Sequence, residues 1–328
     1  MQQRIGFGFA LRCWMSLLGL LVFTCEISRA QSLVEHIIAP QATDPAIDVA
    51  LDDHYAWLDT AASTNHQLFV YLPGTDGVPA NALLVQQLAA QLGYHVVGLM
   101  YPDSVPIQAS CVSQPDPSAC SYATRLELQT GMAVPGSLEN INVPNSIDNR
   151  LTKLLQYLDG TYPNEDWSQF LADGNPKWSR IAFGGISQGG GQSAFIAMLR
   201  VVSRVVMFSA PVEGYGGSPP AWEFTHATPS DRYWGLAHDQ DPAYTNGHIP
   251  AGWTAFGMDA FGPLTQVELS APPYGFTHML FTDLRPQRGG YKNAHASTVI
   301  DFYTPLDEDH NPALAPAWRY MLSAGIND

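Results

Sequence analysis

The sequence predicts an α/β fold with a mostly parallel central sheet, helices on both faces and two long insertions. Short apolar runs alternate with segments of helical periodicity along most of the chain, which is the order typical of parallel sheets. Hydrophobic residues make up 46% of the 328 residues, enough to bury a full core. The insertions lie at about 101–145, which is polar, and 212–231, which is rich in Gly and Pro. We therefore expect a single domain over residues 31–328.

The N-terminus predicts a secretory signal peptide over residues 1–30. Two arginines precede an apolar stretch at 13–24, and the small residue Ala30 occupies the expected cleavage position. The stretch is shorter than the roughly 20 residues that span a bilayer, so we expect no stable membrane insertion of the mature chain. A lipoprotein acylated at Cys25 is the alternative, but the residues before this cysteine are bulkier than such sites usually have. The expected location is secreted or periplasmic.

Six apolar runs bounded by turn residues are predicted strands, after a lead-in of weak periodicity at 31–66. The first run, QLFVYL, ends at Pro73 and Gly74, which favour a turn. The predicted strands are 67–72, 95–100, 180–186, 204–208, 232–237 and 278–284.

Four segments with apolar residues three and four positions apart are predicted helices. Leucines recur at this spacing in the first, before Gly93, and Ser146 is placed to cap the second. The predicted helices are 80–92, 147–158, 192–200 and 312–324.

The first insertion, at about 101–145, has no helical or strand pattern and is expected to be a long loop over a functional site. It contains Cys111 and Cys120, which remain after removal of the signal peptide and are expected to form a disulfide in an oxidising compartment. Closing so small a loop is worth roughly 2.5 kcal/mol. Arg125 and Glu127 in this segment are candidates for contact with a polar substrate or with each other.

Composition and motifs exclude several kinds of partner. Acidic side chains number 30 against 15 basic ones, and no run of Lys or Arg supplies the basic surface that nucleic acids need. The sequence has no second cysteine pair after the signal peptide, no His-Glu-x-x-His motif and no acidic calcium loop. We therefore expect no nucleic-acid partner, no metal and no other cofactor.

The most informative motif is G-x-S-x-G, formed by Gly185, Ser187 and Gly189. An apolar run precedes the serine and a predicted helix follows it, so the chain must reverse direction within about two residues. Small neighbours on both sides of Ser187 permit such a strained turn. The turn would expose the serine hydroxyl at the carboxyl edge of the sheet, near a helix N-terminus that favours developing negative charge.

With this motif, the chain resembles the α/β-hydrolase superfamily over about residues 67–305, in particular its secreted bacterial serine esterases and lipases. The resemblance implies a Ser, Asp, His triad in that chain order, because a serine needs a neighbouring base and the base an orienting carboxylate. It implies Ser187 as the nucleophile and an ester as the substrate.

The resemblance also places the acid a few residues beyond a late strand, often just before proline. Two aspartates compete in the segment HDQDP after 232–237, and Asp241 fits better than Asp239 because Pro242 follows it. Glu213, after the preceding strand, is the remaining alternative. Each of the two aspartates could equally serve as a helix cap or turn residue.

Four histidines follow the candidate acid and are therefore candidates for the base. His278 lies inside a predicted strand, which is typical of a core histidine, and His310 follows an acidic turn. His295 lies in a loop after the last predicted strand, where the resembled family carries its histidine, and is our choice over His248. The residue before it is Ala294, where many members of the family have glycine.

Two backbone donors should stabilise the oxyanion. The resemblance implies the amide of Gln188 as one and an amide of the turn PGTDG as the other, for which we select Thr75, next to Gly74. Many relatives have His-Gly-Gly at this turn, so this sequence departs from the family pattern. The same segment can also cap the following helix.

Two other functional classes are compatible with the sequence. Gly189, Gly191 and Ala194 also fit the G-x-G-x-x-A pattern of dinucleotide-binding oxidoreductases, with Glu213 about 20 residues further on. A hydrolase-like fold that has lost its triad and only binds is the other alternative. Export of the chain disfavours a nicotinamide cofactor, and the presence of serine, acid and histidine in order disfavours a degraded site.

Overall fold

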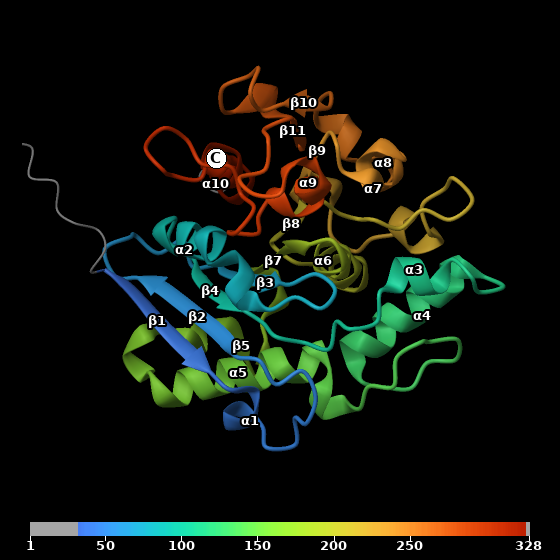
Figure 1. Cartoon of the computed structure of the whole chain (residues 1–328). Helices are drawn as coiled ribbons and strands as arrows, with labels where there is room; N and C mark the ends of the chain where they lie inside the picture. Colours follow the sequence, from blue (N-terminus) through green and yellow to red (C-terminus); the bar gives the residue numbers. More distant parts are fainter. Residues whose placement is uncertain (1–31, 326–328) are drawn as a thin grey trace, which may run out of the picture.

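A computed structural model describes residues 32–325 of the protein. The predicted signal peptide and its cleavage site lie outside the described residues. The main feature is a nine-stranded, mostly parallel sheet (Figure 1), which confirms the predicted α/β class. From one edge to the other its strands are β1 (Leu33–Ile38), β2 (His54–Asp59), β4 (His95–Gly98), β3 (Leu68–Leu72), β7 (Ile181–Ile186), β8 (Arg204–Phe208), β9 (Tyr233–His238), β11 (Met279–Thr282) and β10 (Thr265–Gln266).

The strands from β4 to β10 are parallel, whereas β1 and β2 add an antiparallel edge. A separate two-stranded hairpin consists of β5 (Leu171–Ala172) and β6 (Asn175–Pro176). The helices are α1 (Pro40–Thr43), α2 (Leu83–Gln91), α3 (Ile107–Cys111), α4 (Pro117–Thr130), α5 (Ile147–Thr161), α6 (Gln188–Leu199), α7 (Pro242–Thr245), α8 (His248–Ala255), α9 (Ala294–Ser297) and α10 (Ala315–Ser323).

Alternate residues of the central strands supply two separate hydrophobic cores, one on each face of the sheet. In β3, Leu68, Val70 and Leu72 pack on the face covered by α5 and α6. Phe69 and Tyr71 pack on the opposite face, with residues of α2 and α10. Figure 1 shows α2 and α10 on the side of the sheet away from α5. Every β3 residue is fully buried, which explains why this strand reads as a continuous apolar run.

All six predicted strands are present, but the lead-in at 31–66 also contains β1 and β2. These edge strands are only partly buried, so their residues do not form the apolar runs that mark the central strands. The predicted helices correspond to α2, α5, α6 and α10. Ser146 caps α5 as expected, by accepting a hydrogen bond from the amide of Asn149 at 3.2 Å.

The prediction of a structureless loop at 101–145 was wrong, because this segment contains the short helix α3 and the 14-residue helix α4. Asp116 caps the start of α4, and Gly131, with φ of 69°, ends it. The buried face of α4 includes several polar side chains, so the helix has no apolar stripe to reveal it. These buried polar residues are Ser121, Thr124, Arg125, Glu127 and Gln129.

A disulfide between Cys111 and Cys120 joins α3 to α4 and confirms the predicted pair. The Cα atoms of the two cysteines are 5.6 Å apart, an ordinary separation for this bond. Within residues 32–325, no helix combines the length and the apolar character that a membrane span needs.

Candidate active site

Ser187 lies at a sharp turn between β7 and α6. Its φ of 55° and ψ of −121° are strained for a residue with a side chain. A Cβ atom at Gly185 would lie 2.3 Å from the carbonyl oxygen of Leu72, and one at Gly189 would lie 2.2 Å from the same oxygen. Only glycine fits at these two positions, because the end of β3 packs directly against the turn.

The carboxyl edge of the parallel sheet gathers the predicted triad residues. Ser187 follows β7, Asp241 follows β9, and His295 lies in α9, beyond β11. The amide of Ser187 donates to the carbonyl of Phe208 at 3.0 Å, and the next residue, Ser209, donates its hydroxyl to the carbonyl of His295 at 2.8 Å. The end of β8 is thus bonded both to the serine turn and to the histidine segment.

The same segment is anchored from the C-terminal helix. Trp318 of α10 donates its indole N–H to the carbonyl of Thr298 at 2.9 Å. The hydroxyl of Thr298 lies 3.0 Å from that of Ser209. The position of α9 therefore depends on contacts with both β8 and α10.

Asp241 and His295 form a direct contact, with 2.7 Å between Oδ2 of the aspartate and Nδ1 of the histidine. The side chain of Asp241 is buried and that of His295 is one-third exposed. The other oxygen of Asp241 accepts the amide of Ala243 at 2.9 Å, because Asp241 caps α7. The aspartate is therefore both the expected helix cap and the partner of the imidazole, whose Nε2 is left for a second contact.

The alternative acids contact other partners. Asp239 lies 3.1 Å from Nδ1 of His238, its neighbour in the chain. Glu213 is fully buried and accepts a hydrogen bond from Nε of Arg125 at 2.9 Å. Of the three candidate acids, only Asp241 contacts His295 within the described part of the chain.

Two of the other candidate histidines, His278 and His248, contact residues outside the proposed triad. His278 stacks between Trp234 and Phe261, with ring centroids 4.4 and 4.3 Å away. Burial lowers the pKa of His278 to about 4. Nδ1 of His248 lies 3.1 Å from the carbonyl oxygen of Val212.

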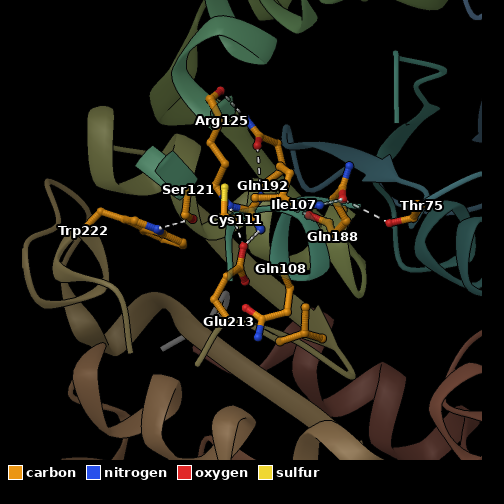
Figure 2. A network of polar contacts seen from close by, with 12 residues as sticks. Thr75, Ile107, Gln108, Cys111, Ser121, Arg125, Gln188, Gln192, Glu213 and Trp222 are labelled. Atoms are coloured by element: carbon orange, nitrogen blue, oxygen red, sulfur yellow. Dashed lines mark hydrogen bonds and ion pairs between the residues drawn. The ribbon is translucent and has the colours of Figure 1, made fainter. Parts of the chain in front are cut away.

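The turn that carries Thr75 lies against the serine turn. A Cβ atom at Gly74 would be 3.3 Å from Cβ of Ser187. The hydroxyl of Thr75 donates to Oε1 of Gln188 at 3.0 Å (Figure 2). Among residues 32–325, neither the amide of Thr75 nor that of Gln188 donates to another protein group. Both predicted oxyanion donors thus lie beside Ser187 with their N–H groups uncommitted.

A buried polar network that the sequence did not reveal lies next to Gln188, the residue after Ser187 (Figure 2). Arg125 forms an ion pair with Glu213 and donates to Oε1 of Gln192 at 3.1 Å. Glu127 does not contact Arg125 but accepts the amides of Val134 and Ile141 at 3.0 and 3.2 Å. No local pattern marks Arg125, because its partners lie 63 or more residues away in the chain.

A depression of about 390 Å³ borders the Thr75 turn and is lined partly by Asp76, Gly77, Asp103 and Glu139. Burial raises the pKa of both Asp103 and Glu139 to about 7. Asp103 accepts the amide of Gly77 at 3.2 Å and so braces the turn. Neither Ser187 nor His295 lines this depression.

The arrangement does not favour the dinucleotide interpretation. The glycines of that motif pack against protein atoms, with Gly189 against β3 and Gly191 against Arg125, where a pyrophosphate would have to approach. Glu213, the candidate ribose ligand, is paired with Arg125. Within residues 32–325, no group of three or more His, Cys, Asp or Glu side chains is placed to hold a metal ion.

Comparison with known proteins identifies no family, since neither a family model nor a curated protein matches the sequence.

Proposed function

We propose that the protein is a secreted serine hydrolase of the α/β-hydrolase type that cleaves carboxylic esters through an acyl-enzyme. The observation that carries this proposal is the 2.7 Å contact between Asp241 and His295 at the sheet edge where Ser187 occupies its strained turn. The mostly parallel sheet with helices on both faces is compatible with that superfamily. The disulfide is compatible with export.

In the proposed mechanism, His295 removes the proton of the Ser187 hydroxyl as its oxygen attacks the ester carbonyl. Asp241 accepts the Nδ1 proton of the imidazole, so Nε2 is the basic nitrogen, and the carboxylate stabilises the imidazolium that forms. The amides of Gln188 and Thr75 would stabilise the tetrahedral oxyanion, each contributing about 3 to 4 kcal/mol. His295 then protonates the leaving alcohol, and water hydrolyses the acyl-enzyme by the same route.

Labelling with a fluorophosphonate tests this proposal directly. The reagent should form a covalent adduct with the wild-type protein and none with Ser187→Ala. Ser193→Ala is the matched control, because Ser193 is a buried serine of α6, the helix that follows Ser187, and donates its hydroxyl to the carbonyl of Gly189. Labelling that persists in Ser187→Ala would remove Ser187 from the mechanism.

Absence of labelling in the wild-type protein would instead favour a protein that binds without catalysis. For a protein that labels, p-nitrophenyl esters of increasing acyl length would identify the preferred acyl group.

A further inference from the structure

The disulfide-bonded helices α3 and α4 hold Gln188, the residue after the serine, from two sides. The amide of Ile107, at the start of α3, donates to the side-chain Oε1 of Gln188 at 3.1 Å. Nη1 of Arg125, in α4, donates to the main-chain carbonyl of Gln188 at 3.3 Å. One residue is therefore bonded to both helices that the disulfide joins (Figure 2).

The side chain of Gln188 connects these helices to the Thr75 turn. Its Oε1 also accepts the hydroxyl of Thr75, so that both lone pairs of this oxygen are used. Its Nε2 donates to the carbonyl of Asp103 at 3.4 Å. Gln188 is only 3% exposed, so water does not readily replace these partners.

The helix pair is itself fixed to the segment that follows β8. The side chain of Gln108 and the main chain of Gly214 exchange two hydrogen bonds, both at 3.2 Å. Ser121 accepts the indole N–H of Trp222 at 3.2 Å. With the buried Arg125 to Glu213 pair, these bonds fix both α3 and α4 to the rest of the protein.

We propose that the disulfide-bonded pair α3 and α4 is a positioning unit for the oxyanion donors, and that it acts through the side chain of Gln188. The unit fixes the distance between the Thr75 turn and the first turn of α6, which carry the two proposed donors. This inference rests on the proposed function. Misplacing one donor lowers the rate of the chemical step, because the oxyanion develops only in the transition state.

Kinetics of Gln188→Leu against Gln86→Leu test the role of the side chain. Gln86 is the matched control, because it is also a buried glutamine and, within residues 32–325, its side chain donates to two carbonyls near α2, those of Pro79 and Ala82. Gln188→Leu should lower kcat about 10- to 100-fold and change KM less than about twofold. Gln86→Leu should lose stability and keep its kcat. Equal kcat in the two variants would overturn the proposal.

The double variant Cys111→Ala with Cys120→Ala tests the role of the disulfide at a temperature well below its unfolding transition. Its kcat should also fall, by at least about threefold, with KM little changed. Treatment of the wild type with dithiothreitol, which reduces the bond to two thiols and becomes a cyclic disulfide, should give the same result. An unchanged kcat in both experiments would show that the disulfide takes no part in positioning.

Hydrogen exchange separates this inference from the proposed function. The hydrogen-bonded backbone amides of Asp76, Gly77 and Ile107 should exchange faster in Gln188→Leu and in the cysteine variant than in the wild type or in Gln86→Leu. This readout needs no activity. The wild type could fail to react with the fluorophosphonate and to hydrolyse esters while exchange in the variants changes as expected. In that case the proposed function fails, but the structural link from α3 and α4 through Gln188 to the Thr75 turn stands. Unchanged exchange in Gln188→Leu would refute this structural link through Gln188.

Discussion

The carboxylate of Asp241 contacts Nδ1 of His295 at 2.7 Å while its other oxygen caps α7. The cap fixes the aspartate, and the buried aspartate in turn orients an imidazole that is one-third exposed. A rigid carboxylate beside an accessible imidazole is the arrangement that the proposed proton transfer from Ser187 requires.

Asp241→Asn should therefore lower kcat by about 10³- to 10⁴-fold, because an amide cannot stabilise the imidazolium and favours the wrong tautomer. Asn is a good helix cap, so the unfolding temperature should change little. Steady-state kinetics with a p-nitrophenyl ester and thermal unfolding measure the two effects. Asp239→Asn is the control, and a greater loss of kcat in that variant would make Asp239 the acid.

Gly189→Ala should disrupt the serine turn, since the new methyl group would lie 2.2 Å from the carbonyl oxygens of Leu72 and Pro73. We expect an unfolding free energy lower by at least about 1–3 kcal/mol and loss of fluorophosphonate labelling. Gly160→Ala in α5 is the matched control, because nothing lies within 4 Å of its Cβ position. That control should gain about 0.5–1 kcal/mol in urea unfolding. If the fluorophosphonate labelled Gly189→Ala as well as it labels the wild type, the turn would tolerate the added methyl group.

Arg125→Met should lower the free energy of unfolding by about 3–5 kcal/mol, because it leaves Glu213 charged and buried without its partner. The double variant Arg125→Met with Glu213→Leu should recover much of this loss, since it removes both charges. Urea unfolding at pH 7 measures both free energies. If the losses of unfolding free energy in Arg125→Met and in Glu213→Leu added up to the loss in the double variant, the ion pair would contribute no coupling energy.

Glu223→Gln should stabilise the protein at alkaline pH. Glu223 is fully buried and neither carboxylate oxygen has a partner among the described residues. Burial, and after it the charge of Glu213, raises its pKa well above 4.5. The folded protein thus keeps a proton that the unfolded chain releases, and its unfolding free energy falls as pH rises above about 4.5, by at most about 1.4 kcal/mol per pH unit. The variant should exceed the wild type in stability at pH 8 and approach it at pH 4.5.

His278→Phe should make the free energy of unfolding less sensitive to acid. Burial lowers the pKa of His278 to about 4, against 6.5 in the unfolded chain. Between these values the unfolded chain binds a proton that the folded protein does not, so wild-type stability rises with pH through this window. Between pH 5 and 7.5 the wild type should gain about 1–2 kcal/mol from this residue, and His278→Phe should lack that gain while keeping the aromatic stack. Parallel pH dependences in urea unfolding would contradict this assignment.

The sequence could predict the features that depend on neighbouring residues. The serine turn is a local pattern, a fully buried strand followed by glycines and a helix, and the structure has that turn at Ser187. The order of the strands brings Asp241 and His295 to one sheet edge, so their contact follows from topology. Their catalytic roles remain proposals.

The features that the sequence did not predict depend on distant residues. Helix α4 has no helical signal in the sequence because its buried side chains, such as Arg125 and Gln129, are polar and find partners in other elements. Apolar periodicity cannot reveal a helix of this kind. The hydrogen bonds of the Gln188 side chain cannot be predicted for the same reason, since its partners lie 81 or more residues away.

The hydrogen bond from Trp318 to Thr298 also has a consequence for biosynthesis. Trp318, which anchors the segment that contains His295, is synthesised 20 residues after Thr298, whose carbonyl it binds. A nascent chain on the ribosome thus contains serine, aspartate and histidine before α10 can dock and fix α9. The proposed esterolytic activity would therefore require α10 to be synthesised and folded onto the sheet.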